Sequence, residues 1–598
     1  MKIFKKFLFI IAGSLILLSL AACSGRKTTD APLEAIFPKD STGVFVVDYS
    51  DESQIENFKN LIARFPEIDT EFKDQFTKGF IDGFNSGANE SGFSGEDISQ
   101  LFKGEWKIGA AVVLQEDGSE VGLVSKNSED IEIYIAARFS ESDKLRDLIN
   151  KLVEKKLGHW GDAKYEEDDG IDYWTNEKEN FYVAFYGDLF FMTTSKERRD
   201  AAIKRIESGE GFNKNEKFAL KANNLASKNL GYVFVDAKFF SDFYGKLFEA
   251  IDKSLVEQIA GMGDVFAFWS AEADGFRIAS STAFDQESEV AKKMLPDEDY
   301  KVGLIDKING DGVFLYFENA GSGGQADYLI KMLESDIAKG YAGDDSKVDY
   351  SGGMFKKFTS FLQKIKVLLD SPVAFVMSDS GAMLPTISLY FQLEEKNTGE
   401  AKNLITDLDE YVDKLIVEAD KMEKEAGGNP GVLKKSIEVT GGGGLRKLYV
   451  DWTAFSESEK SLFSGQVPGF DFTTTKVELY YGLTGDNVFV LAFHPDFPDF
   501  YGKNLLSQNK DYQEAIAKLG DIYGFSVSYI RIDVALKFAE RLLNFYVAGG
   551  LAPEEMMTSY DLYGRRFVGT IKYMVGSSIF KDGVVDQSFF ARIEKVSE

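Results

Sequence analysis

Hydrophobic and polar positions along this chain follow two periods. Short apolar runs rich in Val, Phe and Tyr face one another across turns made of a glycine and an aspartate. Such turns occur at Gly187-Asp188, Asp274-Gly275 and Asp582-Gly583. A turn of this kind between β-rich runs is a strong signal for a β-hairpin. Longer segments, such as residues 142–155 and 399–424, place apolar residues at helical spacing. The pattern therefore predicts hairpins separated by amphipathic helices.

The order of these elements in the first half of the chain recurs in the second half. Each half begins with a strand entered from a glycine, residues 43–49 and 312–318, and closes on an Asp-Gly hairpin. Identity between the halves is low, but chance rarely reproduces so long a shared order. We predict two repeated domains, residues 38–285 and 306–598, joined by a charged linker at residues 286–305.

The fold class that this pattern predicts is α+β, with two repeated domains of largely antiparallel sheet covered on one face by helices. Hairpin-linked strands are antiparallel, whereas parallel strands need a crossover connection. Simple alternation of strands and helices would indicate a parallel sheet, and the recurring hairpins argue against that arrangement.

The first 22 residues have the pattern of a lipoprotein signal peptide. A lysine-rich start precedes an apolar run at residues 7–20, which is shorter than the roughly 20 residues of a membrane-spanning helix. Small residues then lead into a cysteine, in the order Leu20, Ala21, Ala22 and Cys23. We expect signal peptidase to recognise these side chains, cleave after residue 22, and leave Cys23 as the acylated first residue of the mature chain.

Cys23 is the single cysteine of the sequence, so the chain forms no internal disulfide. Residues 23–37 then form the lipidated cysteine and a short tether. Acyl chains on Cys23 would hold the protein on a membrane, because each buried methylene contributes about 0.8 kcal/mol. We predict an extracytoplasmic protein, lipid-anchored to the cell membrane or the outer membrane. Ser24 would permit sorting to an outer membrane.

The composition excludes some partners. A formal net charge of −29 makes nucleic acid and bare anionic lipid surfaces poor ligands, because both require a cationic face. Hydrophobic residues make up 44% of the chain, with 51 Phe and 26 Tyr, which is ample for packed cores without disulfides. The expected partners are the membrane, reached through the N-terminal lipid, and an envelope protein.

One stretch carries a family resemblance. Residues 37–41 read Phe-Pro-Lys-Asp-Ser, residues 43–49 form the first strand, and a helix closes in Phe65-Pro66, followed by a strand containing Gly109. These features resemble a bacterial envelope family catalogued as domain of unknown function 3352, with Lys39 in place of a common alanine. The resemblance implies an exported protein built of repeated α+β units, and it supplies no reaction and no catalytic residues.

The residues that usually carry catalysis are scarce. The two histidines, His159 and His494, fall at non-equivalent places in the two halves. A zinc site needs several His or Cys ligands at close spacing, which this sequence lacks. A serine triad using either histidine would need a nucleophile elbow, and the stretch at residues 92–95 stops short of that motif. We therefore expect no catalytic residue, no metal and no cofactor.

Three further patterns are interpreted as structural. Ser578 and Lys581 match Ser-x-x-Lys, but that motif belongs at a helix start, whereas this copy runs into a hairpin turn. The glycines at residues 441–444 lead into a strand rather than a helix, so they indicate a flexible turn and not a phosphate loop. Acidic loops such as residues 344–345 lack the spacing of an EF-hand.

The leading functional hypothesis is a non-enzymatic binding or scaffold protein of the envelope. One alternative is a carrier for a hydrophobic or small ligand, and another is an envelope hydrolase with dispersed acidic residues. A deep apolar pocket would favour the carrier, and a cleft of acids with raised pKa would favour the hydrolase. A broad exposed apolar patch would favour a protein partner.

Overall fold

The structure is a computed structural model, and it describes most of the chain in two compact units, Met1–Asp285 and Gln286–Glu598. We call them unit 1 and unit 2 and describe each by itself. With a few isolated residues between them, the described ranges are 29–66, 105–114, 131–140, 142–154, 160–219, 228–237, 261–288, 301–321, 360–382, 384–425, 430–440, 443–455, 476–520 and 523–596.

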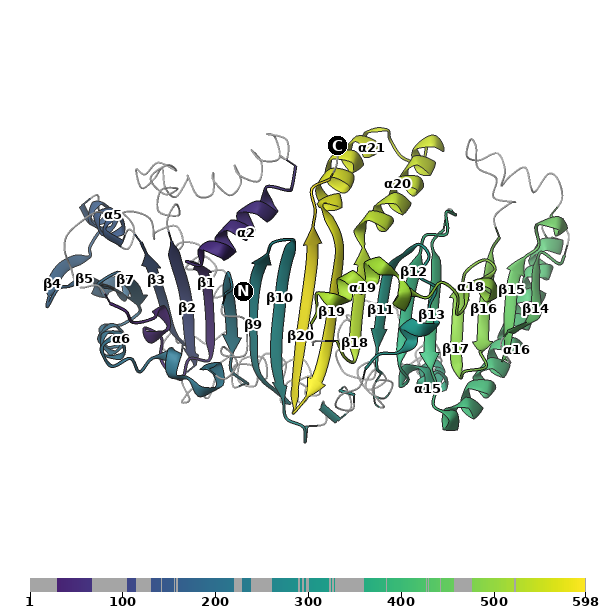
Figure 1. The fold of residues 1–598 in the computed structure, drawn as a ribbon, viewed down its shortest axis with the longest axis horizontal. Helices are drawn as coiled ribbons and strands as arrows, with labels where there is room; N and C mark the ends of the chain where they lie inside the picture. Colours follow the sequence, from purple (N-terminus) through teal and green to yellow (C-terminus); the bar gives the residue numbers. More distant parts are fainter. Residues whose placement is uncertain are drawn as a thin grey trace. The chain divides into compact units, whose positions relative to one another are not determined.

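Unit 1 is built on an antiparallel sheet (Figure 1). In its described part the strands lie in the order β4-β5-β6-β7-β3-β2-β1-β8-β9-β10, and each neighbouring pair is antiparallel. The strands are β1 Gly43–Tyr49, β2 Trp106–Leu114, β3 Ile131–Phe139, β4 Lys164–Asp168, β5 Ile171–Asn176, β6 Phe181–Tyr186, β7 Leu189–Thr193, β8 Gly231–Val235, β9 Met262–Glu272 and β10 Gly275–Phe284. The helices are η1 Leu33–Ala35, α2 Glu52–Ile62, α5 Ser142–Glu154, η4 Glu177–Glu179, α6 Lys196–Ser208 and η5 Phe212–Lys214.

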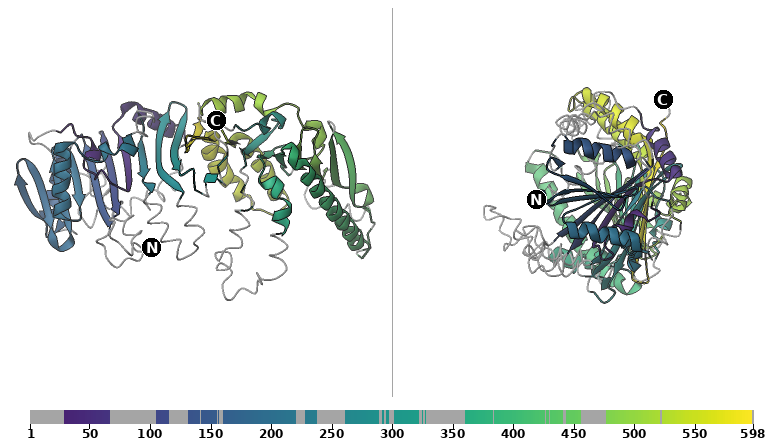
Figure 2. Two further views of the ribbon diagram at one scale, coloured as in Figure 1. Left: turned by 90° about the horizontal axis from the view of Figure 1, so that it is seen from below. Right: turned by 90° about the vertical axis from the view of Figure 1, so that its left-hand side faces the viewer.

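Helices cover both faces of this sheet. Successive residues of a strand point to opposite faces, so neighbouring residues pack against different helices. Ala136 of β3 belongs to the apolar cluster that contains η1 and α6, whereas Ala137 belongs to the cluster that contains α5. The right-hand view of Figure 2 shows α5 and α6 on opposite sides of the strands. The expectation of helices on one face was therefore wrong, since apolar residues occupy both faces of these strands.

Local sequence explains where α6 begins and ends. The Ser195 side chain accepts a hydrogen bond from the backbone N–H of Arg198, which satisfies one of the unpaired donors of the first turn. The helix closes at Gly209, whose φ of 71° is the left-handed conformation that glycine adopts without strain. These two residues give α6 its length of 13 residues.

The beginning of the described chain packs into unit 1. Leu33, Ile36 and Phe37 are 1%, 0% and 0% exposed and belong to the cluster around η1. The expected tether therefore ends before residue 33 and not at residue 37, because these apolar side chains are buried against the sheet. The predicted signal peptide, with Leu20, Ala21, Ala22 and Cys23, lies outside the described residues.

Unit 2 repeats the strand order of unit 1, with each strand number raised by ten. The described strands lie in the order β14-β15-β16-β17-β13-β12-β11-β18-β19-β20, again antiparallel at each pairing. The strands are β11 Val313–Asn319, β12 Val373–Ser378, β13 Thr386–Gln392, β14 Leu433–Thr440, β15 Gly443–Val450, β16 Glu478–Leu483, β17 Val488–Phe493, β18 Ser526–Arg531, β19 Ile571–Lys581 and β20 Val584–Ile593. The helices are η7 Leu304–Lys307, α15 Lys366–Leu369, η8 Glu395–Asn397, α16 Thr398–Glu425, η9 Trp452–Ala454, α18 Phe497–Phe500, η11 Leu506–Gln508, α19 Lys510–Ala517, α20 Ile532–Ala548, α21 Glu555–Ser559, η12 Tyr560–Phe567 and η13 Val568–Thr570.

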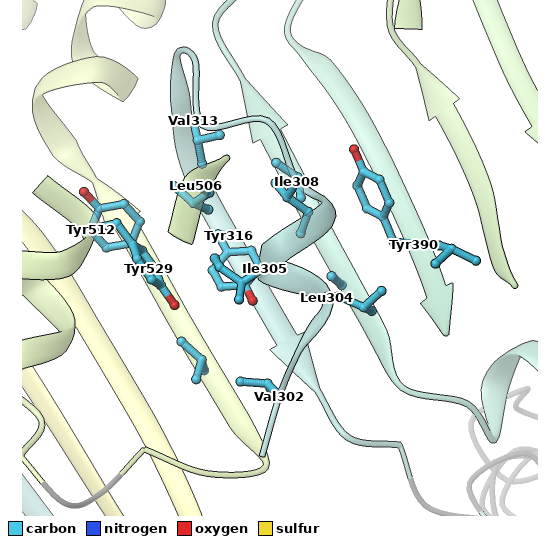
Figure 3. Packing of buried hydrophobic residues seen from close by; sticks show 14 of the residues in the cluster. Val302, Leu304, Ile305, Ile308, Val313, Tyr316, Tyr390, Leu506, Tyr512 and Tyr529 are labelled. Carbon is cyan, nitrogen blue, oxygen red and sulfur yellow. The ribbon is translucent and has the colours of Figure 1, made fainter. Parts of the chain in front are cut away.

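The core of unit 2 combines tyrosine rings from the sheet and from α19 with aliphatic side chains in and around η7 (Figure 3). Tyr316 packs edge-on against Tyr512, with ring centroids 5.9 Å apart. Val302, Leu304 and Ile305 are buried in the same cluster. The expected linker therefore ends before residue 302, because its last apolar residues are buried in the core of unit 2.

A buried carboxylate fixes η7 to the sheet. Glu318 of β11 is 1% exposed and accepts hydrogen bonds from the backbone N–H groups of Gly303, at 2.8 Å, and Leu304, at 2.7 Å. Its other oxygen accepts a short hydrogen bond from the Tyr316 hydroxyl. Burial raises the pKa of Glu318.

In the part of the chain that the structure describes, no helix is both long enough and apolar enough to cross a bilayer.

Candidate functional site

Of the residues singled out in the sequence, those that the structure describes do not form one site. Cys23 and His159 lie outside the described residues, as do two of the glycines at 441–444. Ser578 is buried within β19 and accepts a hydrogen bond from Gln587, while Lys581 ends the same strand. The Ser-x-x-Lys match therefore lies on a strand and not at a helix start, as the structural interpretation required.

His494 is the exception, because it lines a cavity in unit 2. The cavity has a volume of about 220 Å³. Its lining combines small hydroxyl side chains, aromatic rings and two carboxylates. The lining residues are Asn309, Asp311, Gly312, Val376, Ser378, Asp379, Ser380, Thr386, Ser388, Tyr390, His494, Phe497, Phe500 and Tyr501. These residues come from four separate stretches of the sequence.

The floor of the cavity is the hairpin of β12 and β13. Thr386, Ser388 and Tyr390 alternate along β13, so they point to the same face of the sheet. Ser378 of β12 lies directly opposite Thr386 in the strand register. Thr386 and Ser388 are 3% and 4% exposed, which places a row of hydroxyl groups beneath the cavity where apolar side chains are usual.

Gly312 shapes the rim. It enters β11 with a φ of 64°, and a Cβ atom there would collide with the backbone oxygen of Asp379. The backbone N–H of Asp379 in turn donates a hydrogen bond of 2.8 Å to the Gly312 carbonyl. Only glycine combines this conformation with so close an approach of two chain segments. The rim is therefore held in place by backbone geometry.

A shortened helix opens the space above this floor. In each unit a strand pair, β6–β7 or β16–β17, is followed by a helix and then by a 3₁₀ turn that hydrogen-bonds to the beginning of the unit. In unit 1 the Phe212 N–H donates to the Phe37 carbonyl at 2.8 Å. In unit 2 the Leu506 N–H donates to the Ile308 carbonyl at 2.8 Å. The helix between these points is α6, with 13 residues, in unit 1 and α18, with 4 residues, in unit 2.

In unit 1 the side chains of α6 fill the corresponding face. Ala202, Ile203 and Ile206 pack in the core cluster, and the Arg205 guanidinium lies 5.2 Å from the centre of the Tyr134 ring on β3. Unit 2 lacks those helical turns. The helix that follows β17 in unit 2 is the single turn α18, and the hydroxyl floor lines a cavity beside it.

His494 presents a hydrogen-bond acceptor. Its Nδ1 lies 2.7 Å from the Pro495 carbonyl oxygen, which can only accept, so the proton is assigned to Nδ1 and the lone pair to Nε2. Burial lowers the pKa of His494, which keeps the ring neutral at pH 7. The ring contacts Phe500, with centroids 4.6 Å apart.

Two carboxylates lie at the cavity. Asp379 forms an ion pair with Arg541, which reaches it from α20. Asp311 accepts a hydrogen bond of 2.8 Å from the Asn504 side-chain amide, a neutral donor. None of the described lining residues is a lysine or an arginine. The lining therefore carries a net negative charge.

Aromatic rings complete the wall. Tyr390 and Tyr501 stack with centroids 6.3 Å apart and an interplanar angle of 18°. Burial raises the pKa of both hydroxyls, so both are neutral. The Tyr501 hydroxyl donates to Asp486 at 3.0 Å. Within the described residues no group of three His, Cys, Asp or Glu side chains could hold a metal ion. The arrangement offers hydrogen bonds and aromatic contacts, which are the elements of a binding site.

Sequence reasoning considered His494 only as a zinc ligand or triad member, assigned it no role, and missed the rest of the site. The lining residues are ordinary serines, threonines and aromatics, and only the fold assembles them. One signal was available: the stretch between the hairpin and the next helix is shorter in the second half, at residues 494–505, than in the first half, at residues 194–211.

Comparisons with known proteins add little. No protein-family model matches the chain, and no curated protein shows significant similarity to it. Three crystal forms of TP0453 are similar in structure over part of the chain. Form I has 10% identity and a TM-score of 0.23 over 43% of this chain and 80% of that one. Form III has 10% identity and a TM-score of 0.24 over 42% and 80%. Form IV has 7% identity and a TM-score of 0.22 over 42% and 81%. The likeness is too weak to indicate a shared function.

Proposed function

We propose that this chain is an extracytoplasmic, lipid-anchored binding protein of the cell envelope, and that unit 2 binds a small ligand in the cavity beside His494. The observation that carries the binding role is the row of buried hydroxyl groups, from Ser378, Thr386 and Ser388, that lines the cavity. The Thr386 hydroxyl donates to the Ser378 carbonyl at 3.2 Å, and its oxygen still has a lone pair that can accept a hydrogen bond from a ligand. The anchor rests on the sequence pattern that ends at Cys23.

We further infer that the two units descend from one duplicated module. The identical strand order, strand for strand, supports this inference. In this view unit 1 keeps the module with its face filled by α6, and unit 2 is the copy in which that helix is shortened to α18. The resemblance to domain of unknown function 3352 is part of the same proposal, since repeated α+β units are what that family leads us to expect.

A small ligand is favoured over the alternatives. A volume of about 220 Å³ is below the roughly 300–1,000 Å³ of pockets that take drug-sized molecules, and a hydroxyl floor suits a polar ligand better than a lipid. For a hydrolase we would look for an acid with a raised pKa in a cleft. Glu318 has a raised pKa, but its carboxylate is satisfied within the core by Tyr316 and backbone amides. We therefore propose a non-enzymatic role.

The test fills the cavity. Ser388→Leu adds three carbon atoms at the floor, whereas Ser388→Ala removes only the hydroxyl and leaves the space open. The lipoprotein is purified in detergent from its native membrane and screened by thermal shift against a panel of sugars, amines, amino acids and small carboxylates. We expect a compound that raises the melting temperature of wild type and Ser388→Ala but not of Ser388→Leu.

Two controls show whether the effect of Ser388→Leu is specific to the cavity. Thr406→Tyr places a larger side chain on the exposed face of α16 and should not alter any ligand-induced shift. Circular dichroism of each variant checks that the fold is retained. A panel that stabilises Ser388→Leu as much as wild type would refute binding in this cavity.

A further inference from the structure

The lining of the cavity includes three groups that can only accept hydrogen bonds. Carboxylates only accept hydrogen bonds, and both Asp311 and Asp379 lie at the cavity. His494 adds the lone pair of Nε2, because its proton is held by the Pro495 carbonyl. The serine, threonine and tyrosine hydroxyl groups of the lining and the Asn309 amide can act in either role. A ligand that brings donors of its own can therefore pair with Asp311, Asp379 and His494.

The charge of the lining further restricts the class of ligand. Arg541 compensates Asp379, but the hydrogen-bond donor to Asp311 is the uncharged amide of Asn504. An anionic ligand would meet a negative lining with no lysine or arginine among its described residues. The chain as a whole, at −29, also attracts cations and repels anions before they reach the cavity. Both effects favour a positive ligand.

The aromatic wall suits the same kind of ligand. Phe500 is 37% exposed beside the His494 ring, and Tyr501 stacks behind them on Tyr390. The face of an aromatic ring attracts a cation through its quadrupole, and the attraction grows when water is partly excluded. Rings that line a small, negatively charged cavity are therefore suited to an ammonium group.

We propose that the ligand of this cavity is a small hydroxylated amine in its protonated form. This inference rests on the proposed function. The ammonium group lies near Asp311 and the exposed ring of Phe500, while the ligand hydroxyls replace water on the floor at Ser388. His494 accepts one of the ligand's N–H or O–H donors through Nε2.

The experiment compares three ligands of one shape and different charge. Glucosamine, glucose and glucuronate are titrated calorimetrically into the detergent-purified lipoprotein at pH 6.5, where an amine is largely protonated. We expect glucosamine to bind at least tenfold more tightly than glucose, and glucuronate not to bind. The affinity for glucosamine should fall as the salt concentration is raised, because salt screens an ionic contact at a partly exposed site.

Two charge-matched variants locate the effect. Asp311→Asn should reduce the preference for glucosamine over glucose by fivefold or more. Asp499→Asn removes the same charge from α18, close to the cavity but outside its lining, and should leave the preference unchanged. Asp499 is 82% exposed, so its loss should not disturb the fold.

The outcomes separate this inference from the proposed function. If glucose or glucuronate binds as well as glucosamine in wild type and fails in Ser388→Leu, the cavity is a binding site and the preference for a cation is wrong. If none of the three ligands binds, the hydroxylated-amine class is overturned, and the broader panel decides the binding role. Equal loss of preference in Asp311→Asn and Asp499→Asn would also overturn the assignment to Asp311.

Discussion

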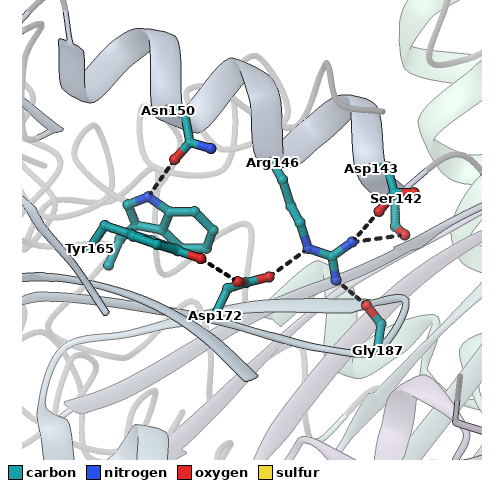
Figure 4. Close-up of polar contacts among 8 residues, drawn as sticks. Ser142, Asp143, Arg146, Asn150, Tyr165, Asp172 and Gly187 are labelled. Carbon is teal, nitrogen blue, oxygen red and sulfur yellow. Dashed lines mark hydrogen bonds and ion pairs between the residues drawn. The ribbon is translucent and has the colours of Figure 1, made fainter. Parts of the chain in front are cut away.

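The ion pair between Arg146 and Asp172 gives a sharp prediction about the stability of unit 1 (Figure 4). Asp172 is 0% exposed; one carboxylate oxygen accepts from Arg146 Nε at 2.8 Å and the other from the Tyr165 hydroxyl at 2.8 Å. Arg146, on α5, also contacts Asp143 at 2.7 Å and donates to the Gly187 carbonyl. If Asp172 is replaced, Arg146 therefore keeps an anionic neighbour in Asp143. If Arg146 is replaced, the buried carboxylate of Asp172 loses the cation that neutralises it.

The magnitudes follow from this asymmetry. Removing one partner of a buried ion pair costs about 3–5 kcal/mol, because the other charge remains buried without compensation. Arg146→Met keeps most of the packing of the side chain and removes its charge, so we expect a cost near the upper end of that range. Asp172→Asn keeps the shape of the side chain and should cost no more than the lower end. Because a domain is stable by only about 5–15 kcal/mol, either change is a large fraction of the total.

Urea denaturation followed by circular dichroism measures these costs for both single variants and the double variant. Removing both charges together should cost less than the sum of the single changes, by about 1–3 kcal/mol. Lys178→Met is the control, because Lys178 and its partner Asp162 are 79% and 63% exposed and their pairing is screened by water. The reasoning is refuted if Arg146→Met destabilises no more than Lys178→Met, or if the two single changes add.

Two further predictions concern the anchor and the core of unit 2. Replacing Cys23 with serine should give an unlipidated precursor that keeps its signal peptide, and a serine variant of mature length on a gel would contradict the assignment. For Glu318, the raised pKa means that the folded state binds this proton more tightly than the unfolded state. Its contribution to stability should therefore fall as pH rises through the raised pKa. We expect the urea midpoint of Glu318→Gln to improve relative to wild type as pH rises above the ordinary pKa of a glutamate. A pH-independent difference would show that the carboxyl titrates normally.

Local signals predicted the elements of this fold well. The turns at Gly187-Asp188, Asp274-Gly275 and Asp582-Gly583 are confirmed as the hairpins β6–β7, β9–β10 and β19–β20. The expected helix at residues 142–155 is α5, and the one at residues 399–424 is α16. Each of these signals depends on residues close together in the chain, because turn conformation and helical spacing are set within a few residues.

Burial boundaries were harder to predict. Leu33 and Phe37 were assigned to a tether, and Leu304 to a linker, yet all three are buried. The segments that carry them are short and rich in polar residues, so their composition indicates exposed chain. Only their position against a sheet face decides that their few apolar side chains join a core.

The sequence by itself determined the hairpins, the long helices and the antiparallel α+β class, because hydrophobic periodicity and turn residues are local properties. The tertiary structure decided the rest. Arg146 and Asp172 are 26 residues apart and form a pair only because α5 crosses β5. The cavity joins residues from 309 to 501, and it exists because α18 is one turn long where α6 has 13 residues. A cavity forms where segments far apart in the sequence do not fill the space between them, so a local sequence pattern does not predict it.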